Sequence, residues 1–156
     1  MREANKAIKR VRHVIPTIDE IRHRFNGATY FSKIDLKNAY HQLELHPLSR
    51  DITTFISHIG LYRNTRMNYG TTSATEIFNE ELRKRLSDLI GVLNIHDDIM
   101  VYGKTKEEHD NNLRRLLDRL REIGITANGK KCVIGSNFID FVGMRFSSKG
   151  KWTPTP

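Results

Sequence analysis

The sequence predicts a single α+β domain in which helices cover one face of an antiparallel sheet. Segments typical of strands alternate with segments typical of amphipathic helices, and 156 residues leave room for one hydrophobic core. No internal repeat, low-complexity tract or linker rich in Gly, Ser or Pro divides the chain. We therefore expect one folded unit.

The first predicted elements are a helix and a strand. In TIDEIRHRF, Thr17 and Glu20 have the spacing of a capping box, Ile18, Ile21 and Phe25 would share a face, and Gly27 suits the helix end. A strand is expected at residues 30–36, because YFSKIDL mixes aromatic and β-branched residues. This strand places Asp35 near its end.

The middle of the chain predicts a hairpin and then a helix. Residues 52–68 suit a hairpin around Gly60, and a helix is expected over residues 73–90. The apolar stripe of this helix would consist of Ile77, Phe78, Leu82, Leu86 and Leu89.

A second long helix is predicted after a capping box formed by Thr105 and Glu108, with its end at Gly124. Its buried stripe would consist of Leu113, Leu116, Leu117, Leu120 and Ile123. The remainder, including FIDFVGMRFSS, predicts short strands and a turn at Lys149-Gly150.

Composition indicates a soluble partner of polyanions. The chain carries 26 Lys and Arg against 18 Asp and Glu, a formal net charge of +8, which favours nucleic acid as a partner. Its single cysteine, Cys132, cannot form an internal disulfide, which favours a reducing compartment. No apolar run approaches the length of a membrane helix, so we expect an intracellular, cytoplasmic protein without membrane contact.

The segment GVLNIHDDIMVYG places Asp97 and Asp98 side by side between two apolar runs. The economical structure is a two-residue hairpin whose turn carries both carboxylates. Like charges this close repel unless a cation lies between them, and carboxylate oxygens suit Mg²⁺. Asp35, at the end of another strand, could join them in a site for two metal ions that supports phosphoryl transfer. The alternatives are a solvated polar turn or a metal-dependent nuclease, which also uses clustered carboxylates.

Four blocks in order resemble the reverse transcriptases of gypsy-type long-terminal-repeat retrotransposons, within the retroviral polymerase group. They are YFSKIDLKNAYHQLELHPLSRDITTF, GLYRNTRMNYG, IHDDIMVYGKTKEEHDNNLRRLLDRLREIGI and FIDFVGMRFSSKG. The resemblance implies a polymerase palm with a ferredoxin-like antiparallel sheet plus part of the fingers. Residues 1–34 and 46–72 would be fingers-side elements, and the remainder would be palm.

The resemblance also implies a function. The chain would be an RNA-directed DNA polymerase domain that transfers a nucleotide from a dNTP to a primer 3′-hydroxyl on an RNA or DNA template. Two Mg²⁺ ions would assist this transfer, and Mn²⁺ could substitute for them. Asp35, Asp97 and Asp98 match the family's catalytic and metal-binding aspartates.

Further residues are matched by position to ligand contacts. The implied nucleotide-binding residues are Leu36, Tyr40, Tyr69 and Gly70. The implied primer or template residues are His96, Val142, Gly143 and Arg66, and Arg63 is a further candidate for template phosphates. Tyr40 matches the aromatic residue under the sugar of the incoming nucleotide, where a ring would exclude a 2′-hydroxyl; the alternative is a tyrosine packed in the core.

The chain also departs from the family pattern. Ile95 stands where the family has tyrosine, and Thr75 and Asn79 stand where proline and glutamine are common. Both ends look cut, so we expect a longer polyprotein with thumb, ribonuclease H and integrase regions, packaged in a virus-like particle in the parent element. A second hypothesis is a truncated, catalytically inactive fragment that retains only nucleic-acid binding.

Overall fold

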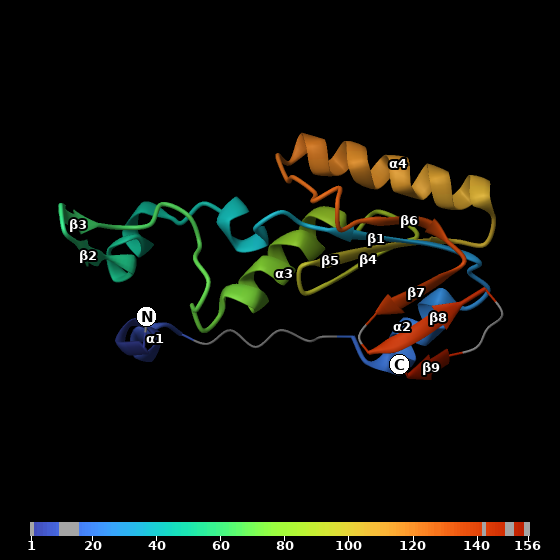
Figure 1. The fold of residues 1–156 in the computed structure, drawn as a ribbon, viewed down its shortest axis with the longest axis horizontal. Helices are drawn as coiled ribbons and strands as arrows, with labels where there is room; N and C mark the ends of the chain where they lie inside the picture. Colours follow the sequence, from blue (N-terminus) through green and yellow to red (C-terminus); the bar gives the residue numbers. More distant parts are fainter. Residues whose placement is uncertain (1, 10–15, 142, 149–151, 155–156) are drawn as a thin grey trace.

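The fold is built around a four-stranded sheet in the strand order β4-β5-β1-β6, in which each neighbouring pair is antiparallel. The computed structural model describes residues 2–9, 16–141, 143–148 and 152–154. The strands of this central sheet are β1 (Tyr30–Asp35), β4 (Val92–Ile95), β5 (Asp98–Gly103) and β6 (Val133–Ser136) (Figure 1). The predicted strand at residues 30–36 is therefore confirmed as the inner strand β1.

Two helices, α3 (Ala74–Leu86) and α4 (Lys106–Glu122), cover one face of the central sheet. Because side chains alternate along a strand, Ile34, Ile99 and Val101 all point to this face. They pack against the buried helix side chains Phe78, Leu82, Leu86, Leu116 and Leu120. The predicted α+β fold with helices on one face is confirmed for α3 and α4.

The opposite face is partly covered by α2 (Ile18–Phe25) and by a second antiparallel sheet. This sheet has the order β7-β8-β9, from strands Phe138–Phe141, Met144–Ser147 and Trp152–Pro154 (Figure 1). The Phe25 ring lies between the Phe31 ring of β1 and the Phe146 ring of β8, with centroid distances of 5.8 and 5.0 Å. One helix therefore lies on the face that the sequence pattern left without helices.

Local capping signals place the helix starts. At α2 the Thr17 hydroxyl accepts from the Glu20 N–H while the Glu20 carboxylate accepts from the Thr17 N–H, so the predicted capping box is confirmed. At α4 the Thr105 hydroxyl caps the Glu108 N–H, but the Glu108 carboxylate accepts from the N–H of Lys104 instead. The predicted start of α4 is thus confirmed, but the predicted hydrogen bond from the Thr105 N–H to the Glu108 carboxylate is replaced by one from the Lys104 N–H.

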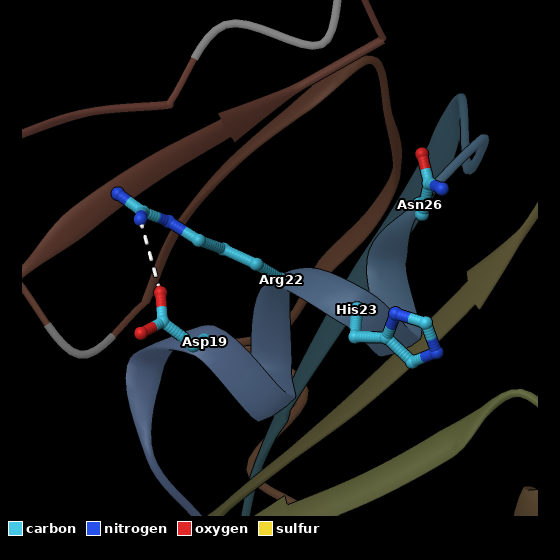
Figure 2. Close-up of a pocket in the computed structure, with 4 residues that line it drawn as sticks. All are labelled: Asp19, Arg22, His23 and Asn26. Atoms are coloured by element: carbon cyan, nitrogen blue, oxygen red, sulfur yellow. Dashed lines mark hydrogen bonds and ion pairs between the residues drawn. The ribbon is translucent and has the colours of Figure 1, made fainter.

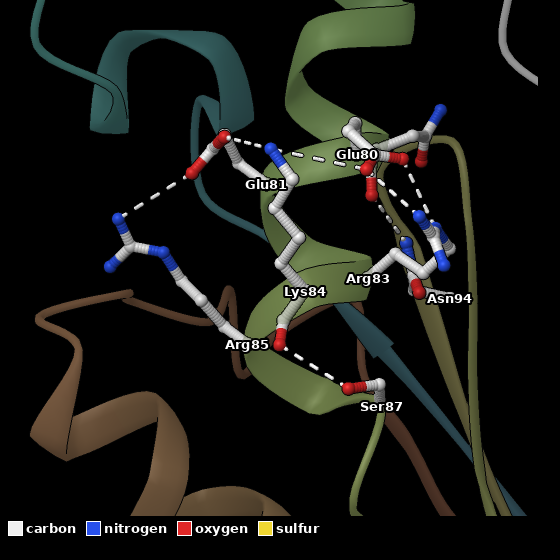
Figure 3. Close-up of polar contacts among 8 residues, drawn as sticks. Glu80, Glu81, Arg83, Lys84, Arg85, Ser87 and Asn94 are labelled. Atoms are coloured by element: carbon white, nitrogen blue, oxygen red, sulfur yellow. Dashed lines mark hydrogen bonds and ion pairs between the residues drawn. The ribbon is translucent and has the colours of Figure 1, made fainter.

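Helix α3 ends at Leu86, four residues before the predicted end at residue 90. The Ser87 hydroxyl donates to the Lys84 carbonyl (Figure 3). The Leu89 N–H donates to the Leu86 carbonyl and closes a turn. The exposed face of α3 carries ion pairs one turn apart, including Arg83 with Glu80 at 2.8 Å and Lys84 with Glu81 at 3.1 Å (Figure 3). The apolar spacing of the sequence continues to Leu89, but the helix ends at Leu86 and the chain forms a turn there.

The predicted hairpin over residues 52–68 is shorter than expected. It consists of β2 (Phe55–Ser57) and β3 (Gly60–Tyr62), and residues 51–53 form a 3₁₀ turn. The hydroxyls of Thr53 and Thr54 donate to nearby carbonyls and stabilise this turn in place of a strand. The ribbon lies at the opposite end of the molecule from β7–β9 (Figure 1).

The remaining elements are short. They are α1 (Arg2–Ala7) and the 3₁₀ helices Ala39–Gln42, Pro47–Ser49 and Asp51–Thr53. The predicted turn at Lys149-Gly150 lies outside the described residues. Within the described ranges, no helix combines the length and apolarity needed to cross a membrane.

Candidate active site

Asp35 and Asp98 lie directly opposite each other across the β1–β5 ladder. Asp35 is the last residue of β1 and Asp98 is the first of β5, so both lie at the same end of the sheet. Residues opposed in a ladder point to the same face. That face is the one opposite α3 and α4, and both aspartates remain partly exposed on it.

Asp97 lies in the turn that joins β4 to β5, next to this pair. Ile95 pairs with Asp98, so the two turn residues are His96 and Asp97. The prediction that Asp97 and Asp98 form the turn was wrong in register, because Asp98 remains in the ladder. The positive φ that such a turn requires falls on His96, at 56°, an uncommon conformation for a residue other than glycine.

The side chains of the three aspartates do not all converge. In the part of the chain that the structure describes, no group of three or more His, Cys, Asp or Glu side chains is arranged to hold a metal ion. The Asp98 carboxylate instead accepts an ion pair from the Lys33 ammonium, with an N–O distance of 2.6 Å. The carboxylate oxygens are the right donors for Mg²⁺, and two of the three aspartates carry no ion pair within the described ranges.

The pKa of the Tyr69 hydroxyl is affected by both Asp97 and Asp35. Burial raises the pKa of the Tyr69 hydroxyl, and the negative charges of Asp97 and Asp35 and the neighbouring Tyr40 raise it further. An anionic phenolate would be repelled by nearby carboxylates, so both aspartates are close enough to influence this hydroxyl. The ring of Tyr69 is half exposed, and its centroid lies 4.8 Å from that of the Tyr40 ring.

Tyr40 is fixed by its neighbours. Its hydroxyl is 2.8 Å from the hydroxyl of Thr75, and its ring centroid lies 4.8 Å from that of Tyr69 and 5.7 Å from that of Phe78. The Phe78 contact is edge-to-face, which favours one ring orientation. Thr75, which stands where the family commonly has proline, therefore forms a hydrogen bond with Tyr40 that the sequence did not predict.

The other predicted nucleotide-binding residues differ in access. Leu36 is buried in the core beneath α3 and α4, and its backbone forms a bridge with Ala127, so its side chain is not free to contact a ligand. Gly70 is exposed with a φ of 83°. Its carbonyl accepts from the Asn5 side chain, which also accepts from the Thr72 N–H at 3.0 Å. No sequence signal pointed to Asn5.

The predicted primer and template residues are dispersed. Gly143, with a φ of 71°, lies between the paired ends of β7 and β8, and Val142 lies outside the described residues. Arg66 is exposed, and its guanidinium donates to the Gln42 carbonyl. Arg63 forms an ion pair with Asp51.

The surface hollow on α2 does not include these residues. It is lined by Asp19, Arg22, His23 and Asn26, and Arg22 donates to the Asp19 carboxylate at 3.2 Å (Figure 2). The three aspartates instead lie at one end of the central sheet.

The antiparallel sheet, with two helices on one face and aspartates at one end of the other face, agrees with the polymerase palm expected from the sequence. The sequence model of the family described as reverse transcriptase (RNA-dependent DNA polymerase) matches residues 1–146. The chain belongs to this family.

The chain is similar to curated proteins that are several times its length. The chain is 34% identical over 139 residues to "Uncharacterized protein K02A2.6" of Caenorhabditis elegans, covering 89% of the chain and 11% of the relative. It is 33% identical over 153 residues to the "Enzymatic polyprotein" of Cestrum yellow leaf curling virus, covering 94% of the chain and 23% of the relative. The "Retrovirus-related Pol polyprotein from transposon 412" of Drosophila melanogaster is 30% identical, with 96% of the chain and 12% of the relative covered. The chain thus spans a small part of these relatives.

Solved structures confirm the fold. A foamy viral protease-reverse transcriptase in complex with dsDNA superposes with a TM-score of 0.83 at 22% identity, covering 99% of this chain and 32% of that one. The same kind of enzyme in complex with an RNA/DNA hybrid superposes with a TM-score of 0.75 at 24% identity, covering 81% of this chain and 17% of that one.

Proposed function

We propose that this chain is the polymerase palm, with part of the fingers, of a gypsy-type retrotransposon polyprotein, and that it extends a DNA primer on an RNA or DNA template. The observation that carries the proposal is the placement of Asp35 opposite Asp98 on β1 and β5, with Asp97 in the adjoining turn. Family membership and this placement support nucleotidyl transfer. The net charge of +8 supports a nucleic-acid partner.

Asp35 and Asp97 are the proposed principal ligands for the two divalent ions. When bound, Mg²⁺ or Mn²⁺ would act as a Lewis acid for the primer hydroxyl and offset the charge of the triphosphate. The protein contributes a fixed frame, because Asp35 belongs to an inner strand that is hydrogen-bonded on both sides. Asp97 belongs to a two-residue turn, which leaves its carboxylate exposed to an incoming nucleotide.

Tyr40 is the proposed selector for deoxyribonucleotides. The contacts with Thr75, Tyr69 and Phe78 support a fixed ring that would exclude a 2′-hydroxyl. We expect Tyr40→Ala to admit ribonucleotides, whereas Tyr40→Phe retains the ring and should retain selectivity. Unchanged sugar selectivity in Tyr40→Ala would assign the ring to packing alone.

Primer extension on an RNA template, with Mg²⁺ or Mn²⁺ and dNTPs, tests the proposed function. The unaltered chain should incorporate nucleotides, and Asp35→Asn and Asp97→Asn should each lower the rate by about three orders of magnitude or more, because each removes a proposed metal ligand. Retained extension in either variant would refute the assignment. Salt-sensitive template binding without incorporation by the unaltered chain would support the binding-only alternative.

A further inference from the structure

Lys33 is a cation inside the candidate active site. Its ammonium lies 2.6 Å from the Asp98 carboxylate, and the two side chains are 28% and 24% exposed. Lys33 precedes Asp35 by two residues on β1, so both point to the same face of the sheet. It is opposed to Met100, which makes Asp98 its diagonal neighbour on β5.

The pair is held by the sheet rather than by flexible surface segments. Both residues belong to ladders whose register is fixed by buried neighbours on the other face, such as Ile34 and Ile99. Because both side chains are mostly buried, solvent and salt screen this ion pair less than they screen the exposed pairs on α3. Asp35 and Asp97 have no such ion pair within the described ranges.

We propose that Lys33 is a positioning residue that competes with divalent cations for Asp98. The inference rests on the proposed metal site. The Lys33 ammonium is paired with the Asp98 carboxylate, one of the three carboxylates at this end of the sheet. It offsets one of the three like charges at this end of the sheet when no metal is bound, and Asp35 and Asp97 remain the available ligands.

This arrangement predicts opposite effects on folding and on metal binding. Replacing Lys33 with an uncharged residue leaves the three aspartates to repel one another, which should lower the melting temperature in metal-free buffer. The same replacement frees Asp98 and removes a positive charge, which should raise the affinity for a divalent cation. A lysine with only a structural role would lower the melting temperature without changing that affinity.

Mn²⁺ binding, measured by the loss of the electron paramagnetic resonance signal of free Mn²⁺, tests the inference on the full chain without any polymerase assay. We expect Lys33→Met to bind Mn²⁺ about three- to tenfold more tightly than the unaltered chain. Lys33→Arg, which keeps the charge, should bind within about twofold of the unaltered chain. In the Asp98→Asn background most of the gain from Lys33→Met should disappear, because the carboxylate for which the lysine competes is gone.

Thermal melting of the same proteins gives a second readout and checks that each variant folds. Added Mn²⁺ should raise the melting temperature of Lys33→Met by more than it raises that of the unaltered chain. Equal Mn²⁺ affinities for the two proteins, or a gain that persists in full in Asp98→Asn, would overturn the role of Lys33 while leaving the metal site in place. Mn²⁺ binding that Asp35→Asn leaves unaffected would overturn the metal site itself, and the competition with it.

Discussion

The β1–β5 ladder presents two unlike ends on one face of the central sheet. At one end Phe31 pairs with Tyr102, and Phe25 of α2 covers both rings at centroid distances of 5.8 and 4.9 Å. At the other end Asp35 pairs with Asp98 and remains partly exposed. Burial is strong enough at the first end to raise the pKa of the Tyr102 hydroxyl.

The difference shows how packing at one place can position charge at another. Two opposed carboxylates are unfavourable neighbours, and the Lys33–Asp98 ion pair offsets only part of that repulsion. The apolar end fixes the register, because a slip of one residue would move every side chain of the strand to the opposite face. The aromatic end therefore holds the acidic end in place.

The largest expected effect on folding comes from the aromatic end. Phe31 is 1% exposed, and Phe31→Ala should lower the free energy of unfolding by about 3–5 kcal/mol through lost burial and a cavity. Asp35→Asn, at the acidic end, should leave it unchanged or raise it slightly, since one of two opposed charges is removed. Urea denaturation of both variants measures the contrast, and equal losses of stability would contradict the division between the two ends.

A smaller effect is expected where α4 approaches the sheet. A Cβ added at Gly103 would lie 2.5 Å from the backbone nitrogen of His109 and 2.7 Å from its Cα, so α4 would have to move. We expect Gly103→Ala to cost about 1–3 kcal/mol of unfolding free energy. Gly129→Ala is the matched control, because no atom lies within 4 Å of the added Cβ. Similar denaturation midpoints for the two variants would show that contact at Gly103 does not limit the packing of α4.

The smallest expected effect is a pH dependence at the hairpin that helps to cover the aromatic end. Hydrogen bonds from Arg145, at 2.7 and 2.8 Å, hold the pKa of the Asp140 carboxyl below its ordinary value. A lowered pKa in the folded state means that the stabilisation is present above the ordinary pKa and is lost as pH falls through the folded value.

Arg145→Met should therefore lose less stability than the unaltered chain between about pH 6 and about pH 3, as measured by urea denaturation at each pH. Both side chains are more than a third exposed, so solvent screening keeps the difference small. An identical pH dependence in the two proteins would mean that this ion pair contributes nothing in that range.

Local signals predicted the beginnings of elements better than their ends. Thr17 and Thr105 correctly predicted the starts of α2 and α4, because a capping box involves only residues three positions apart. Leu89 continued the apolar period of α3, yet the helix ended at Leu86, since the periodicity does not register the turn that Ser87 makes. Ile18 shared the predicted face of α2 but remains 42% exposed.

The candidate site shows the same limit. Asp35, Asp97 and Asp98 could be selected from the sequence, and the sheet brings Asp35 opposite Asp98. The register of the turn follows from the pairing of Ile95 with Asp98 between β4 and β5, which the Asp-Asp dipeptide alone does not encode. The K-I-D spacing in a strand places Lys33 on the same face as Asp35, but the ion pair of Lys33 is with Asp98, whose position depends on the β1–β5 pairing. The contact of Asn5 with residues 70 and 72 had no signal in the sequence.

The location of bound Mn²⁺ tests the central claim most directly. Crystals of the chain soaked in Mn²⁺ should give an anomalous difference peak at the acidic end of the β1–β5 ladder, about 2–2.5 Å from carboxylate oxygens of Asp35 and Asp97. The peak should be absent from crystals of Asp35→Asn. A metal that binds elsewhere, or a peak that persists in that variant, would contradict the assignment of this end of the sheet as the catalytic centre.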